Sequence, residues 1–256
     1  MINLFIGYDR KETIAYHVLA HSILSRSSEP VSIIPLNREN LKAQFIRPRG
    51  ALDSTEFSMS RFIVPHLMNF QGHAIFMDCD MLCLGDIAEL WAQRDYAQDA
   101  SGHIEPGGFA VLVKKHTHEP KEGTKFLGAE QTKYARKNWS SLVLFDCNRC
   151  RPLTRHIVNT QNHGLWFHQF DWLPDEEIGA IDGPWNHLAG YDDYDPDAKL
   201  VHFTHIGPWH DPERTADIDY RVHWELGLQD MLCGDNPHAS SGAIQAAQRS
   251  ILGEGQ

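Results

Sequence analysis

The sequence predicts an α/β fold in which helices cover both faces of a mostly parallel sheet, and three observations support this. Short apolar runs that read as buried strands alternate with segments whose apolar residues recur at helical spacing. Hydrophobic residues make up 42% of the chain and charged residues 22%, which is ordinary for a globular protein and argues against disorder. No internal repeat, low-complexity tract or linker interrupts the 256 residues, so we expect a single domain over residues 1–256.

The first part of the chain reads strand, helix, strand. Residues 2–6 form an apolar run ended by Gly7, which is typical of a buried strand. Apolar residues at helical spacing follow, and they are Ile14, Val18, Leu19 and Ile23. A second strand is expected over residues 31–36, followed by a basic surface loop over residues 36–55.

The remaining elements are predicted from the same signals. A helix is expected over residues 58–70, bent at Pro65, and an apolar strand from residue 73 runs into an acidic turn and a second short apolar run. Further strands are expected at residues 109–113, 142–145 and 200–203, and further helices near residues 131–137 and 152–161. The Ala-, Ser- and Gly-rich residues 236–256 predict a loosely attached tail.

The charge balance narrows the class of protein. There are 23 Lys and Arg residues against 34 Asp and Glu residues, and the net charge of −11 argues against nucleic-acid binding. No apolar run is long enough to span a membrane, and the N-terminus lacks the basic flank of a signal peptide. We therefore expect a cytoplasmic protein, with peripheral association at a membrane left open.

The five cysteines are an odd number in a chain without an export signal, which predicts reduced thiols. They are Cys79, Cys83, Cys147, Cys150 and Cys233. The first four would together supply a four-sulfur zinc site. The alternative is that they are small core residues near strand ends, and we favour it because neither pair lies in a Gly-rich knuckle.

An acidic pair carries the clearest functional signal. Asp78 and Asp80 lie two residues apart at the carboxyl end of an apolar strand, so both side chains can face one point. Ligands of open α/β sheets bind at this end of the strands, and two close carboxylates favour a divalent cation between them. A turn stabilised by Asp side chains is the alternative.

His202 is the third candidate ligand. It lies near the end of a late strand, shortly before a Gly-Pro-Trp turn, and the sixteen His residues of the chain favour metal or proton chemistry. A set of two carboxylates and one imidazole suits Mn²⁺, with Mg²⁺ as the less suitable ion, and phosphate oxygens would complete the coordination.

The order of four features resembles a known family. The segment Phe76-Met-Asp-Cys-Asp-Met-Leu82 has Arg61 seventeen residues upstream of its first Asp. The first strand runs into Asp9, and His202 comes late, before a Pro-Trp pair. Over residues 1–211 this order resembles the retaining glycosyltransferases of family 8, which include bacterial lipopolysaccharide galactosyltransferases and glycogenin.

The resemblance implies a GT-A fold and a reaction. A Rossmann-like nucleotide-binding half, residues 1–95, would continue into an acceptor-binding and metal-completing half, residues 96–235. The donor would be a UDP-sugar whose diphosphate binds the metal, and a hexose would be transferred with retention, as in bacterial-type glycan synthesis. The acceptor is left open between a saccharide, a lipid-linked molecule and a protein.

The family's functional residues carry over by position. Asp9 would bind uracil with Tyr8 beside it, Arg61 would hold the donor sugar, and Asp78 would touch the donor as well as the metal. The implied metal ligands are Asp78, Asp80 and His202.

Two departures from the family affect the donor site. Gly207 stands where the family has a Lys that clamps the diphosphate, so His205 or backbone N–H groups would replace it. Gln169 lies where the family has an Asp-Gln-Asp motif beside the sugar, and Asp171 would replace one missing carboxylate. The expected catalytic groups are therefore Gln169 and Asp171, with Arg61 orienting the donor.

Other interpretations stay open beside this one. A nucleotidyltransferase acting on sugar phosphates, or an inert module that binds sugar nucleotides or glycans, would use the same fold. Trp185 and Asn186 would either contact the acceptor or form a structural turn. The aromatic residues between Trp166 and Trp172 would line a sugar subsite or, as we favour, pack in the core. The acidic residues between 192 and 197 lack the Gly and Glu of a calcium loop, which favours a solvated loop.

Overall fold

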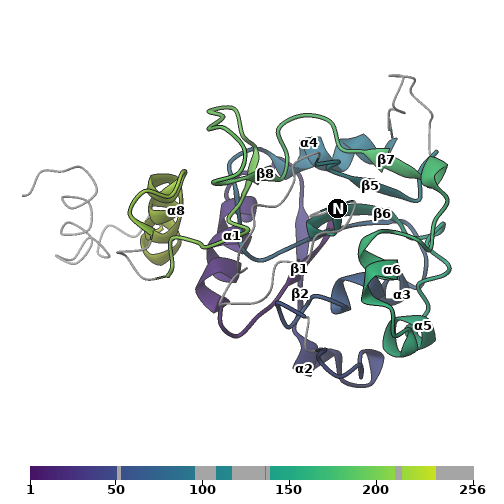
Figure 1. The fold of residues 1–256 in the computed structure, drawn as a ribbon. Coiled ribbons are helices and arrows are strands. Elements are labelled where there is room, and N and C mark those ends of the chain that lie inside the picture. The colour runs from purple at the N-terminus through teal and green to yellow at the C-terminus, as the bar shows by residue number, and fades with distance from the viewer. Residues whose placement is uncertain (51–52, 96–107, 117–135, 137–138, 211–214, 235–256) are drawn as a thin grey trace, which may run out of the picture.

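The structure, a computed structural model, has a mixed sheet with helices on both faces (Figure 1). Helices α1 and α8 lie on one side of the sheet, and α3, α5 and α6 lie on the other. The structure describes residues 1–50, 53–95, 108–116, 136, 139–210 and 215–234. The helices are α1 (Thr13–Leu24), α2 (Arg38–Leu41), α3 (Val64–Leu67), α4 (Ile87–Ala92), α5 (Arg155–Thr160), α6 (Gly164–His168) and α8 (Arg221–Cys233).

The main sheet has six strands in the order β2-β1-β3-β6-β5-β7 within the described residues. Strand β1 pairs in parallel with β2 and β3, and β5 pairs in parallel with β7, whereas β6 runs antiparallel to both β3 and β5. The predicted mostly parallel α/β sheet is therefore confirmed. The strands are β1 (Ile2–Gly7), β2 (Val31–Leu36), β3 (His73–Met77), β5 (Val111–Val113), β6 (Leu142–Asp146) and β7 (Ile178–Ala180).

A second, three-stranded sheet places the functional residues. It consists of β4 (Met81–Cys83), β9 (Leu200–His202) and β8 (His187–Leu188). Strand β4 follows β3 after a short turn and runs antiparallel to β9, which brings His202 opposite Met81. Strand β8 runs parallel to β9 on its other side. The small sheet thus joins the end of β3 to a segment more than a hundred residues away.

Two apolar cores hold the sheets and helices together. The larger core covers the six-stranded sheet and includes fully buried aromatic side chains, among them Phe57, Phe62, Phe76 and Phe145. The smaller core lies between α1, the second sheet and α8, and it includes Val18, Val201, Tyr220 and Trp224. Burial of such side chains is the main favourable term in folding. Phe167, Phe170 and Trp172 also pack in the larger core, as we favoured from the sequence.

Most predicted strands are confirmed with small shifts, but two segments differ. The helix expected over residues 58–70 is a 3₁₀ turn (Ser60–Ile63) followed by α3, and it ends where Asn69 and Phe70 take left-handed backbone angles. The loop expected over residues 36–55 contains α2, because the Asn37 side chain accepts a hydrogen bond from the N–H of Glu39 and caps it.

Other elements were missed or cannot be compared. Helices α4, α6 and α8 and strands β7 and β8 were not expected, because each is short or carries only a weak apolar period. The expected helix over residues 131–137 and the tail over residues 236–256 lie outside the described residues, Arg136 apart. Within the described part of the chain, no helix has the length and apolar character to cross a membrane.

The cysteines do not gather around a metal. All five are free thiols, and four of them are buried. Sγ of Cys79 contacts Oε2 of Glu12, whereas Sγ of Cys150 contacts the carbonyl of Ala110. Among the described residues, no group of three potential ligands includes a cysteine, so the four-sulfur zinc site is not formed. The core interpretation is confirmed.

Candidate metal and donor site

Asp78, Asp80 and His202 converge at the carboxyl end of β3. The two aspartates occupy the turn between β3 and β4, and the register of β9 against β4 delivers the histidine. One ligand atom of each residue lies within 4.8 Å of the others, and this is the single such group among the described residues. His202 Nε2 is 3.4 Å from Asp80 Oδ1. The convergence expected from the sequence is therefore confirmed.

The carboxylate oxygens of this group have unused bonding capacity. Within the described structure, Asp78 Oδ1 and Asp80 Oδ1 are buried and accept no well-formed hydrogen bond, although each lies close to a basic nitrogen. Buried polar atoms nearly always have partners, so such oxygens point to a ligand. Two carboxylates and one imidazole are a donor set that fits a divalent cation such as Mn²⁺.

The electrostatics of the group favour a cation as well. The pKa of Asp78 is raised to about 7, because burial, with a contribution from Asp80, outweighs the opposite effect of Arg61. Burial lowers the pKa of His202, but the carboxylates of Asp80 and Asp78 outweigh this effect and leave it above its ordinary value. The clustered carboxylates repel one another, and a bound cation would relieve that repulsion.

Arg61 is held against Asp78. Its Nη1 is 2.9 Å from Asp78 Oδ1, and the same guanidinium donates to the carbonyls of Ser140 (2.7 Å) and Ser58 (3.1 Å). It stacks over the rings of Phe76 and Phe57, with its Cζ atom 5.0 and 5.4 Å from their centroids. Arg61 is only 6% exposed, so its orientation is fixed by groups on every side.

Asn186 contacts His202 at Nδ1, the ring nitrogen that does not face Asp80. It is fully buried, and its Oδ1 lies 2.9 Å from His202 Nδ1. Its Nδ2 donates to Ser141 Oγ at 2.9 Å and lies 3.1 Å from His116 Nε2. The sequence offered a Trp-Asn pair after Gly-Pro at this position, but its contact with His202 had no sequence signal.

The turn after β1 holds two further carboxylates. Asp9 is 1% exposed, and its two oxygens accept from the backbone N–H groups of Lys11 and Glu56, each at 2.9 Å. Glu12, which sequence reasoning missed, is buried beside Cys79. Burial raises the pKa of Glu12 to about 9, with Asp80 and Asp9 adding to the shift. Tyr8 packs edge-on against Tyr16 next to this turn.

The remaining expected donor residues lie in loops. His205 is exposed, and Gly207 is buried with its N–H donating to His210 Nδ1. A Cβ atom on Gly207 would lie 2.0 Å from the Trp209 ring, so the ring occupies the space where the family's Lys side chain would begin. His205 and the described backbone N–H groups stay as the proposed replacements.

Gln169 and Asp171 follow α6. The backbone carbonyl of Gln169 accepts from Arg136, and Asp171 is exposed. His168, directly before Gln169, bonds through Nδ1 to Ser140 Oγ, and the carbonyl of Ser140 is the one that Arg61 binds. The described contacts therefore link this segment to Arg61, but they do not link Gln169 or Asp171 themselves to the metal group.

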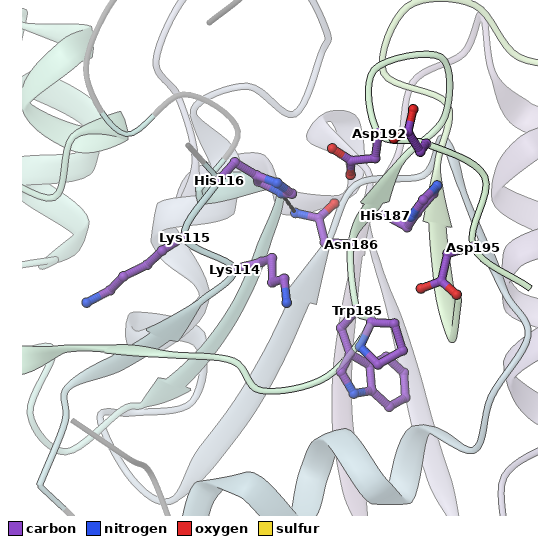
Figure 2. A pocket seen from close by; sticks show the side chains of 10 residues that line it. Lys114, Lys115, His116, Trp185, Asn186, His187, Asp192 and Asp195 are labelled. Atoms are coloured by element: carbon purple, nitrogen blue, oxygen red, sulfur yellow. Dashed lines mark hydrogen bonds between the residues drawn. The ribbon is translucent and has the colours of Figure 1, made fainter. Parts of the chain in front are cut away.

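A pocket of about 390 Å³ is lined in part by Asn186, whose Oδ1 also contacts His202 (Figure 2). Its volume lies within the range of small-molecule sites. Strand β5 leads into one wall, and β8 with the following acidic loop forms the other. Its lining includes Lys114, His116, Asn186, His187, Asp192 and Asp195.

The chain has a relative among proteins of known sequence. No protein-family model matches the chain. Protein CDI of Arabidopsis thaliana is 47% identical over 224 residues, which cover 84% of this chain and 82% of that protein.

Solved structures of similar fold include glycosyltransferases. The apo bifunctional glycosyltransferase WbbM superposes with a TM-score of 0.57 at 14% identity, over 96% of this chain. GlyE of Streptococcus pneumoniae TIGR4 gives 0.54 at 12% identity over 98% of this chain. The galactosyltransferase LgtC, solved with donor and acceptor sugar analogues, gives 0.52 at 12% identity over 89% of this chain and 95% of its own. This chain spans 51% of the WbbM chain and 64% of the GlyE chain.

The 12–14% identity to the solved structures shows only that the fold is shared. The 47% identity to Protein CDI shows that the two proteins belong to one family. The mixed six-stranded sheet, the Asp-Asp-His group at the end of β3 and the superpositions agree on a GT-A glycosyltransferase fold. The chain thus has a GT-A fold and belongs to the family of Protein CDI.

Proposed function

We propose that this protein is a metal-dependent glycosyltransferase that moves a hexose from a UDP-sugar to an acceptor with retention, in the manner of family 8. The observation that carries the proposal is the Asp78-Asp80-His202 group, in which one buried oxygen of each aspartate has no well-formed hydrogen bond, at the strand end where a GT-A fold binds its donor. We divide the domain into a nucleotide-sugar half, residues 1–95, and an acceptor half, residues 96–235.

The donor would lie against residues of two turns, the one after β1 and the one between β3 and β4. Asp78, Asp80 and His202 would hold Mn²⁺, or less favourably Mg²⁺, which would neutralise charge on the departing diphosphate. Arg61 would orient the sugar while it keeps Asp78 in place. Asp9 would accept the uracil N3–H with a second lone pair, because each carboxylate oxygen can accept two hydrogen bonds.

Gln169 and Asp171 are the residues that we propose beside the reacting sugar. Their segment is linked to Arg61 through His168 and Ser140, which supports a position near the donor. The product's anomeric configuration, read by NMR of the transferred sugar, tests retention. An inverted product would contradict membership in the family 8 type of mechanism.

The pocket beside Asn186 is where we propose that the acceptor binds. Its walls combine amine, imidazole and carboxylate groups, so hydrogen-bond donors and acceptors of both charges face one space. Sugar hydroxyl groups donate and accept at once, and a mixed lining suits them better than it suits an anion or a cation. His187 Nε2 is buried in the described structure without a hydrogen-bond partner, which supports a polar ligand there.

The acceptor proposal is tested by UDP release from UDP-sugars with Mn²⁺. Neutral hexoses and disaccharides should accelerate release more than their 6-phosphates do, and His187→Phe should remove the acceleration. His156→Phe, a matched change on the exposed face of α5, should preserve it. If only the sugar 6-phosphates accelerate UDP release, or if neutral sugars still accelerate it in His187→Phe, the proposal that a neutral saccharide binds in this pocket is contradicted.

The donor proposal is tested by calorimetric titration of UDP with Mn²⁺ and with EDTA. The wild type should bind UDP tightly only with Mn²⁺, whereas Asp80→Asn should bind weakly in both. Asp217→Asn, the same chemical change at an exposed position, is the control and should behave like wild type. Equal UDP binding by the wild type in EDTA would overturn the metal site, and release of pyrophosphate instead of UDP would indicate a nucleotidyltransferase.

A further inference from the structure

Asn186 is fully buried, lines the pocket and contacts His202. Its backbone φ is 60°, in the left-handed region that Asn tolerates better than most residues. The turn that carries it is anchored on both sides: the carbonyl of Pro184 accepts from the N–H of Lys199, and Trp185 is buried in the larger core. A buried polar residue held in such a conformation indicates a specific role for its side chain.

The partners of the Asn186 amide fix its orientation. Nδ2 carries two hydrogens and has two neighbours, Ser141 Oγ at 2.9 Å and His116 Nε2 at 3.1 Å, and the second contact is drawn in Figure 2. With both hydrogens directed there, Oδ1 faces His202 Nδ1. A carbonyl oxygen only accepts, so this amide orientation requires a proton on His202 Nδ1. In the neutral ring, Nε2 then carries a lone pair on the side that faces Asp80.

The same amide joins the nitrogen ligand to the oxygen ligands. Ser141, which accepts from Asn186, also accepts the backbone N–H of Asp78 through its carbonyl at 2.9 Å. One side chain thus spans the start of β6, where the Asp78 turn is anchored, and the end of β9, where His202 lies. A displacement of Asn186 would change the distance between the two kinds of ligand.

We propose that Asn186 is a positioning residue for the metal site: its Oδ1 holds His202 in the Nδ1–H tautomer and directs Nε2 to the cation. The inference rests on the proposed function, since it concerns the same metal. Residues that bind the second nitrogen of a metal-ligating His fix its tautomer and ring orientation, and their loss typically weakens metal binding about 10- to 100-fold.

The first test uses metal-free wild-type protein and needs no variant. Nitrogen-15 NMR of the neutral His202 ring, assigned by its loss in His202→Gln, reports which nitrogen carries the proton. We expect the Nδ1–H tautomer. The alternative is a flipped amide that donates to Nδ1 and leaves the proton on Nε2, facing Asp80. Observation of that Nε2–H tautomer would overturn the proposal.

The second test compares two substitutions by calorimetry of Mn²⁺ in the presence of UDP. Asn186→Gly tolerates the left-handed backbone but removes the amide, and it should weaken Mn²⁺ binding about 10- to 100-fold. Asn186→Asp keeps an oxygen opposite Nδ1 and should recover most of that loss. Both variants should bind UDP in EDTA as weakly as wild type.

The outcomes separate this inference from the proposed function. Unchanged Mn²⁺ binding in Asn186→Gly, or equal losses in both variants, would show that the Oδ1 contact does not position His202. Absence of Mn²⁺ binding in the wild type would instead refute the metal-dependent function, while the tautomer measurement in the metal-free protein would still decide the role of Asn186.

Discussion

Two acidic turns follow the carboxyl ends of neighbouring parallel strands, and their carboxylates have different surroundings. After β1, both oxygens of Asp9 accept backbone N–H groups. After β3, Asp78 and Asp80 each have a buried oxygen without a well-formed hydrogen bond. Strands β1 and β3 are paired in register, so the turns are close equivalents in the fold. Satisfied carboxylates hold a turn together, whereas buried unsatisfied ones keep their capacity for a ligand.

The largest expected effect comes from removing one charge of the β3 turn. Asp80→Asn should weaken Mn²⁺-supported UDP binding on the order of 100-fold or more, because it removes a ligand charge from a site built around a cation. The same titration in EDTA should be unchanged. Asp9→Asn should weaken UDP equally with and without Mn²⁺. If the metal dependence is lost in Asp9→Asn and kept in Asp80→Asn, the contrast between the two turns is reversed.

A smaller effect is expected at Arg61. The guanidinium reaches Asp78 and two carbonyls at once, and a Lys ammonium cannot reproduce that fork. Arg61→Lys should lower turnover of the UDP-sugar about 10- to 100-fold, or roughly 1.4–2.7 kcal/mol, while UDP affinity changes little. Steady-state rates and UDP titration measure the two quantities separately. Full turnover in the variant would show that Arg61 does not orient the donor.

Asp9 is expected to affect stability and base preference more modestly. Asp9→Asn replaces one accepting oxygen by an NH₂ group opposite a backbone donor, which should lower the free energy of unfolding by about 1–3 kcal/mol. Urea denaturation measures this loss. Loss of the uracil contact should also reduce the preference for UDP over GDP. If the variant loses stability but keeps its preference for UDP over GDP, Asp9 stabilises the turn and does not bind the base.

The metal group could be predicted from the sequence because its signals are local. Asp78 and Asp80 end one apolar strand and His202 ends another, so the sequence shows each candidate ligand at a strand end, and the antiparallel pairing of β9 with β4 brings them together. Arg61 was placed only by the spacing of the family it resembles. The fold class followed from the alternation of strands and helices in the same way.

The supporting residues could not be predicted because their roles arise from tertiary contacts. Asn186 has a left-handed backbone conformation and contacts His202, sixteen residues away in the sequence. The raised pKa of Glu12 depends on its burial near Asp80 and Cys79. The expected helix over residues 58–70 failed for a related reason. Its first part is a 3₁₀ turn and its last residues, Asn69 and Phe70, take left-handed backbone angles, and residue propensity indicates neither feature.

The last expected effect is a slope of stability with pH in the metal-free protein. The pKa of Glu12 is raised by burial from 4.5 to about 9, and that of Asp78 from 3.8 to about 7. A group whose pKa is higher in the folded chain gives its full stabilisation below the unfolded value and loses it as the pH rises through the folded value. The free energy of unfolding should therefore fall between about pH 4 and about pH 9.

Urea denaturation at about pH 5 and about pH 9 measures this slope. Asp80→Asn should flatten it, because the Asp80 carboxylate contributes to raising the pKa of both Glu12 and Asp78. Saturating UDP with Mn²⁺ should flatten it too, since a bound cation stabilises the ionised carboxylates. Asp217→Asn, on an exposed segment, should retain the wild-type slope. Stability that rises with pH in metal-free wild type would mean that these carboxylates are already stabilised as anions, and the β3 turn would then resemble the β1 turn.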